Sequence, residues 1–141
     1  MDTTTITTRS RLVLRANAVF STVGGLIAVV AAGWLSDVSG IDHVAVTRLG
    51  GIGLLLFAVD VFRQSRLPEH KLPFALLQTS IADASWVIAT VVVLALVDFT
   101  GWGVAGAIVI AAAVADFGAV QLWLRSKLVG TADRETVVAT A

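Results

Sequence analysis

The 141-residue sequence contains no cysteine, and this absence excludes several kinds of chemistry at once. Disulfide exchange, thiolate catalysis and cysteine-ligated metal sites all need a thiol. Small four-helix thiol oxidases linked to quinones are excluded for the same reason. Proline is also scarce, and both prolines, Pro68 and Pro73, lie between two apolar runs, where they favour a connection between elements.

Charge is sparse and balanced, with 14% charged residues, 10 basic and 10 acidic. A chain without net positive charge has no broad basic field for nucleic acid, so we expect no nucleic-acid partner. The two histidines, His43 and His70, fall in loops at opposite ends of the predicted spans and cannot form one metal site. No Ser-His-Asp spacing or histidine cluster occurs. We therefore predict no enzymatic activity, no catalytic residues, no metal site and no cofactor.

Apolar residues make up 57% of the chain and form four runs, each of about 20 residues or more, long enough to cross a bilayer. We expect an all-α membrane protein with a four-helix bundle at 11–128. The predicted spans are 12–35, 44–64, 74–97 and 103–124. Residues 1–10 and 129–141 are predicted to be polar cytoplasmic tails without fixed structure, and 34–43 to be a loop.

The basic residues indicate the orientation of the spans. Nine of the ten fall on one side of the predicted bundle and only Arg48 falls near the other. This bias predicts a multi-pass protein of the inner (plasma) membrane with both termini in the cytoplasm. It also argues against an antiparallel dimer of dual topology. The nine residues are Arg9, Arg11, Arg15, Arg63, Arg66, Lys71, Arg125, Lys127 and Arg134.

Two pairs of segments suggest an internal repeat. The polar-Ala-x-aromatic pattern of 17–20 in the first span returns at 83–86 in the third. Segment 58–67 matches 119–128 in register. We interpret the chain as two tandem, similar helical hairpins related by a pseudo-twofold axis along the membrane normal.

Several polar residues lie inside the apolar runs. Asp83 and Asp116 each lie about 12–14 Å from the cytoplasmic ends of their spans, so we expect their carboxylates to lie at one level. Asn17, Asp60 and Gln121 form a shallower predicted layer. An ionisable residue at such depth is a candidate functional residue by default.

Two interpretations of these residues remain open. In the first, they line a polar cavity that faces the cytoplasm, in which the two buried aspartates share a proton or meet a cationic ligand. In the second, they hold the helices together by hydrogen bonds worth about 1 kcal/mol or less each. The candidate ligand-binding or proton-coupled residues are Asp83, Asp116, Asp60, Asn17, Trp86 and Gln121. Trp86 is equally compatible with an interfacial position.

The chain resembles a family of small bacterial four-span membrane proteins of unknown function. The resemblance covers about residues 11–128 and rests on the segments 15–18 with 24–25, 48–51, 83–86 and 120–121. In that family an aspartate stands where this chain has Asn17, and an asparagine where it has Asp83. The resemblance implies a bacterial membrane protein in which Asn17 and Asp83 touch one another, and it gives no activity.

Two hypotheses of function follow. The first is a non-enzymatic membrane protein that acts through lateral helix contacts, as a homo-oligomer or as a subunit of a larger inner-membrane complex. The faces of small residues around Gly24, Gly25, Gly50 and Gly51 favour it, because they allow neighbouring helices to approach closely. The second is a small transporter or lipophilic-ligand-binding protein that uses the buried aspartates.

Overall fold

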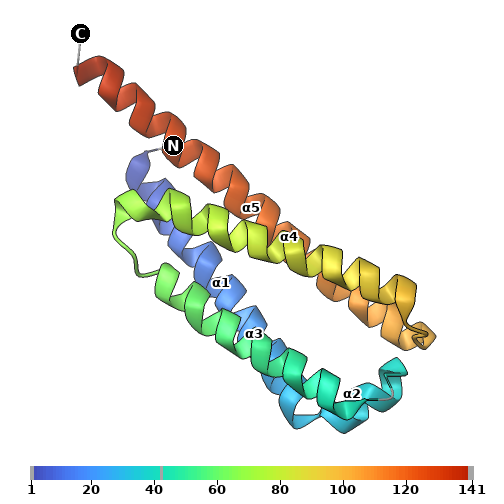
Figure 1. The fold of residues 1–141 in the computed structure, drawn as a ribbon. Helices are drawn as coiled ribbons and strands as arrows, with labels where there is room; N and C mark the ends of the chain where they lie inside the picture. The colour runs from blue at the N-terminus through green and yellow to red at the C-terminus, as the bar shows by residue number, and fades with distance from the viewer. Residues whose placement is uncertain (1, 42, 140–141) are drawn as a thin grey trace.

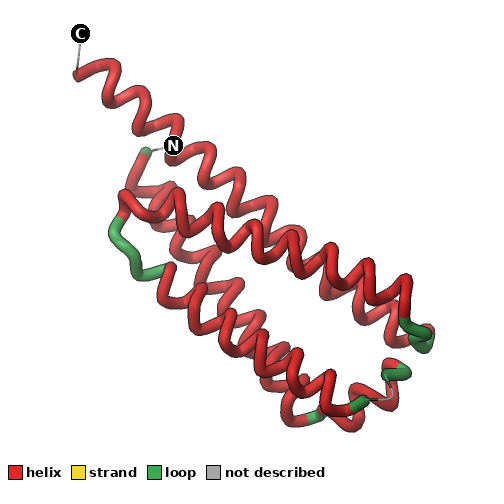
Figure 2. Tube along the Cα trace, in the orientation of Figure 1, coloured by secondary structure: helices red, strands yellow, loops and turns green. Residues whose placement is uncertain are grey.

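The computed structural model describes residues 2–41 and 43–139, with side chains up to Thr131, and this part of the chain is helical throughout apart from short connections (Figures 1 and 2). The expected all-α architecture is confirmed. Asp42 of the predicted loop and residues 1, 140 and 141 of the predicted tails lie outside the described residues. The elements are α1 (Thr3–Val30), α2 (Ala32–Ser39), α3 (Val44–Gln64), the 3-10 helix η1 (Glu69–Lys71), α4 (Leu72–Leu96) and α5 (Gly101–Ala139).

Four of these helices, α1, α3, α4 and α5, are long and apolar enough to cross a membrane. Their outward-facing side chains are largely apolar. Leu56 on α3 and Val109 on α5, for example, are each 68% exposed. Apolar side chains that cover most of the outside of a bundle are unfavourable in water and compatible with surrounding lipid.

The long helices pair into two hairpins. α1 packs against α3, α4 packs against α5, and α1 also contacts α5 between the hairpins. Both termini lie at the same end of the bundle, together with the α3–α4 connection (Figure 1). The buried apolar core lies in this half of the bundle and is formed by Ile6, Leu14, Ala18, Val61, Leu72, Leu76, Leu124 and Leu128.

The N-terminal segment differs from the predicted tail, because α1 already begins at Thr3. Asp2 caps the helix by accepting a 3.3 Å hydrogen bond from the Thr5 amide. Ile6 and Ser10 are buried, and the Ser10 hydroxyl donates to the Ile6 carbonyl over 2.9 Å. The expectation that this polar segment lacks fixed structure was wrong. The Asp2 cap, the burial of Ile6 and the hydrogen bond that Ser10 makes within its own helix are enough to extend α1 to Thr3.

Two further segments are helical where a loop or tail was expected. Most of 34–43 belongs to α2, which is followed by its C-cap residue Gly40 in the left-handed conformation (φ 82°). At the other end of the chain, α5 continues to Ala139 and extends beyond the other helices in Figure 1. No proline follows Leu124, so nothing in the sequence there forces the helix to break, although Lys127 and Gly130 are typical of a helix end.

The first hairpin depends on a close crossing of α1 and α3 at two glycines. A Cβ atom built on Gly25 would lie 2.9 Å from the Gly51 carbonyl oxygen, and one on Gly51 would lie 2.9 Å from the Cβ of Ala28. Neither distance leaves room for a side chain. The expectation that small residues permit close approach is thus confirmed at Gly25 and Gly51, whereas a Cβ on Gly50 or Gly53 would meet nothing within 4 Å.

Substitution of adjacent glycines on α3 tests this crossing. We expect Gly51→Ala to destabilise the protein by about 1–3 kcal/mol, because the added methyl group forces the two backbones apart. Gly50→Ala is the matched control, and it should be neutral or stabilising by up to about 1 kcal/mol because alanine favours the helix. Thermal unfolding in detergent micelles measures both. Equal melting temperatures for the two variants would contradict the close crossing.

Candidate functional site

Asp83 of α4 is the centre of a buried hydrogen-bonded cluster that joins three helices. The Asn17 amide of α1 donates to Asp83 Oδ2 over 2.8 Å, and the Gln121 amide of α5 donates to the same oxygen over 3.3 Å. All three side chains are at most 2% exposed. The contact between Asn17 and Asp83, which the family resemblance implied, is therefore present.

Two serines orient the amides of this cluster. Ser80 Oγ donates to the Leu76 carbonyl over 2.7 Å and also lies 3.2 Å from Gln121 Oε1, while the amide nitrogen of Gln121 is the end that faces Asp83. On α1, Ser21 Oγ donates to Asn17 Oδ1 over 3.3 Å, which turns the Asn17 amide nitrogen toward Asp83 in the same way. The sequence analysis did not single out Ser80, although its position three residues before Asp83 places it on the same helix face.

No basic side chain meets Asp83 among the described residues. The groups around it are the neutral side chains of Asn17, Gln121, Ser21 and Ser80. Both amide donors use Oδ2, and no hydrogen bond within the described part of the chain reaches Oδ1. The carboxyl group therefore has one acceptor oxygen in use within the protein and one left over.

Asp60 belongs to a second, separate group of polar residues. Gln64 donates to Asp60 Oδ2 over 2.6 Å, and the Thr79 hydroxyl donates to Gln64 Oε1 over 3.0 Å. Gln64 and Thr79 are buried, whereas the Asp60 side chain is exposed. This group links α3 to α4 near the end that carries the termini, and it does not join the Asp83 cluster.

Asp116 does not pair with Asp83, contrary to our expectation. Gly118 and Gln121 of α5 are buried against the bundle, while Asp116 is exposed. At about 100° per residue, Asp116 is rotated by about 200° from Gly118, which turns its carboxylate away from α4. The expectation was wrong because it compared the depths of the two carboxylates and not their positions around the helices.

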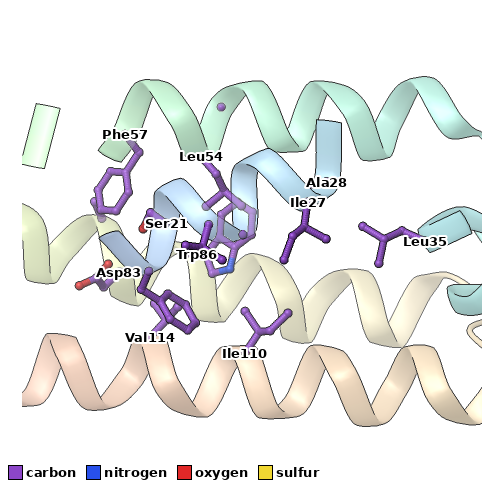
Figure 3. A pocket seen from close by; sticks show the side chains of 15 residues that line it. Ser21, Ile27, Ala28, Leu35, Leu54, Phe57, Asp83, Trp86, Ile110 and Val114 are labelled. Atoms are coloured by element: carbon purple, nitrogen blue, oxygen red, sulfur yellow. The ribbon is translucent and has the colours of Figure 1, made fainter. Parts of the chain in front are cut away.

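A cavity of about 480 Å³ lies between the two hairpins, beside the Asp83 cluster. Asp83 lies at one end and Leu35 of α2 at the other, with the Trp86 ring between them (Figure 3). Apart from Asp83, Ser21 and the indole of Trp86, its lining side chains are apolar. This volume is in the usual range of about 300–1,000 Å³ for small-molecule sites.

The position of the cavity follows from the sizes of the inward-facing residues. In the half of the bundle that carries the termini, large side chains such as Leu14, Leu76 and Leu124 fill the interior. Beyond Asp83, large side chains such as Ile27 and Ile110 line a space that they do not fill, and Gly24 and Gly53 contribute no side chain to it. The cavity thus extends from Asp83 away from the termini, whereas the polar cavity expected from the sequence opened toward them.

Beyond the Leu35 end of the cavity, α2 is hydrogen-bonded to the α4–α5 turn. The Thr100 amide donates to the Ser39 carbonyl over 3.0 Å, and the Thr100 hydroxyl donates to the Val38 carbonyl. Gly103 permits this approach, since a Cβ there would lie 2.6 Å from the Ser39 oxygen. The two hairpins are therefore bonded on both sides of the cavity, at Asp83 and at Thr100.

Comparison of the chain with known protein families, with curated proteins and with solved structures finds no match. The resemblance to small bacterial four-span proteins stays a prediction. Among the described residues, no group of three or more histidine, cysteine, aspartate or glutamate side chains is placed to hold a metal ion. The arrangement around Asp83 is suited to accept hydrogen bonds or to meet positive charge, and it presents no nucleophile beside a base.

Exchange of the two central residues tests the Asn17–Asp83 hydrogen bond. Asn17→Asp alone should cost about 1–3 kcal/mol of stability, because it sets two carboxyl groups against each other and removes a donor. The double variant Asn17→Asp/Asp83→Asn restores one amide and one carboxyl group, and should return to within about 0.5 kcal/mol of the original protein. Chemical or thermal unfolding in micelles measures the cycle. If the double variant is at least as unstable as Asn17→Asp, the direct hydrogen bond between positions 17 and 83 is excluded.

Proposed function

We propose that the chain is an integral membrane protein of four spans that binds a lipophilic ligand in the cavity beside Asp83, without catalysing a reaction. The observation that carries the proposal is the cavity itself, which is apolar along its length and ends at a buried carboxylate with a free acceptor oxygen. A largely apolar pocket with one convergent polar group is typical of small-molecule sites. In a membrane such a site receives its ligand from the lipid phase.

The distribution of charge supports the proposed orientation, with both termini in the cytoplasm. The basic residues at the starts or ends of α1, α3, α4 and α5 gather at the end of the bundle that carries the termini, and Arg48 lies near the start of α3 at the other end. This is the bias that cytoplasmic loops show. The family resemblance adds the inner membrane of a bacterium as the proposed location.

The burial pattern gives partial support to the proposed tandem hairpins. Residues 66 positions apart on α1 and α4 are buried alike, as for Ser10 with Leu76 and Asn17 with Asp83. The proposed match of α3 with α5 is weaker, since it aligns the exposed Asp60 with the buried Gln121. We therefore propose that the resemblance of the hairpins is strongest where α1 and α4 meet.

Photolabelling tests whether the cavity takes a ligand. A neutral long-chain alcohol that carries a diazirine is added to the protein in lipid nanodiscs, and labelled peptides are mapped by mass spectrometry. We expect labels on the cavity-lining parts of α1 and α4, and we expect an excess of the unreactive alcohol to suppress them. Gly53→Leu should remove these labels, because Gly53 lines the cavity and has room for a larger side chain.

Gly50→Leu is the matched control for this experiment. Gly50 lies on the same helix and also has open space around its Cβ position, but it does not line the cavity. This variant should keep the suppressible labels. Labelling confined to lipid-facing residues, with no suppression by excess alcohol, would contradict the proposed function.

A second candidate function, lateral association of two copies, is favoured by Asp116. Its exposed carboxylate lies within the span of α5, where lipid offers no hydrogen bond, and the exposed small residues Ala112 and Ala119 share its face. Two copies that meet along this face would bring their Asp116 side chains to one level, where they could share a proton. Small residues on the same face permit close helix contact.

Oxidative cross-linking tests this second candidate, because the chain has no cysteine of its own. Ala112→Cys should form a disulfide-linked dimer in native membranes, since a face-to-face contact brings the two Cβ atoms within bonding range of about 3.5–4.5 Å. Val59→Cys, on the exposed side of α3, is the control and should remain monomeric. Equal dimer yields at both positions, or none at Ala112→Cys, would exclude the α5 interface.

A further inference from the structure

We infer that the ligand of the cavity is a lipophilic organic cation whose positive charge lies against Asp83. This inference rests on the proposed function and adds the charge of the ligand to it. It follows from three features of the site: the free carboxylate oxygen, the lack of any positive group in the protein around it, and the aromatic side chains beside it.

The free oxygen is Asp83 Oδ1. Asn17 and Gln121 both donate to Oδ2 and so fix the carboxyl group in one orientation. Within the described residues, Oδ1 has no hydrogen-bond partner. It is also not fully enclosed by protein atoms. Asp83 lines the cavity while its side chain is only 2% exposed overall. Asp83 thus lines the cavity with one carboxyl oxygen that no group among the described residues uses.

The site lacks a positive charge of its own. The cavity is lined by no lysine, arginine or histidine, and the hydrogen-bond partners of Asp83 are neutral amides. A buried carboxyl group takes up a proton unless a cation or further donors stabilise its ionised form. A cationic ligand supplies that charge. An anion would be repelled, and a zwitterionic phospholipid headgroup would bring a phosphate for which the cavity has no basic partner.

Aromatic rings next to Asp83 favour a cation as well. Phe20, Phe57 and Trp86 come from α1, α3 and α4 and line the same cavity (Figure 3). Cations are attracted to the faces of such rings, and most strongly to tryptophan. Aliphatic residues such as Ile27 and Ile110 then cover the hydrocarbon part of the ligand. The combination fits a bulky ammonium or phosphonium ion better than a neutral lipid.

A pair of probes with nearly the same shape and opposite charge tests the inference. Tetraphenylphosphonium and tetraphenylborate are each used to displace the saturable diazirine label from the protein in phosphatidylcholine nanodiscs. With concentrations expressed as the amount of each probe dissolved in the lipid, we expect the cation to displace the label at about tenfold or more below the concentration needed for the anion. Because phosphatidylcholine is present in excess throughout, displacement by the cation also shows that a zwitterionic headgroup is not the preferred occupant.

The exchanged variant Asn17→Asp/Asp83→Asn supplies the control on the protein side. It keeps one carboxyl group in the cluster but moves it to position 17, which does not line the cavity. Relative to the original protein in the same nanodiscs, it should lose the preference for the cation, so that the ratio of the two displacing concentrations falls about tenfold or more. Comparison within one membrane composition removes the effect of unequal partitioning of the probes into lipid.

The outcomes separate this inference from the proposed function. Cation preference that disappears in the exchanged variant supports the inference. The inference would be overturned by equal displacement by both probes, by displacement by neither, or by a preference that the exchanged variant retains. In each of these cases a saturable label in the cavity would still support the proposed function. If no saturable label forms in the original protein, the proposed function fails and the inference fails with it.

Discussion

An acidic side chain in the middle of an apolar helix needs hydrogen-bond donors from its neighbours, because neither hydrocarbon nor apolar side chains supply any. Asp83 obtains two such donors, Asn17 from α1 and Gln121 from α5. This requirement fixes the rotation of three helices about their axes. It also fixes where the two hairpins meet, since Asn17 belongs to one hairpin and Asp83 with Gln121 to the other.

The same carboxylate marks a change in packing along the bundle. On the side of the termini, large side chains such as Leu14, Leu76 and Leu124 fill the interior. On the other side, the lining residues leave a cavity that reaches from Asp83 to Leu35, and beyond it α2 is hydrogen-bonded to the α4–α5 turn at Thr100. The hairpins are hydrogen-bonded to each other at Asp83 and at Thr100, and the gap lies between these two levels of the bundle. A bundle built only for stability would place larger residues there.

Much of this fold could be predicted from the sequence, because long apolar runs determine where spans lie. The predicted second span, 44–64, coincides with α3, and the third differs from α4 by two residues at its start and one at its end. The Asn17–Asp83 contact was also anticipated, through the family resemblance. Composition could not reveal α2 or the first turns of α1, since these short or polar helices depend on contacts such as the Ser39–Thr100 hydrogen bond.

The candidate site was predicted only in part. Asp83, Asn17, Gln121 and Trp86 do gather around one region, but Asp60 and Asp116 do not. The difference lies in helix rotation: depth in the membrane follows from counting residues, whereas the direction of a side chain depends on which face of the helix is buried. The cavity was beyond prediction for a related reason, because its volume depends on how closely the two hairpins approach.

The central claim, that the space beside Asp83 holds a lipophilic ligand, is tested most directly by native mass spectrometry of the protein extracted gently from its own membrane. We predict that the chain, as a monomer or homo-oligomer, carries a small molecule of reproducible mass, and that this mass belongs to an organic cation. A chain that emerges bare under conditions that retain lipids, or one bound in fixed ratio to foreign subunits with no small molecule, would contradict the account.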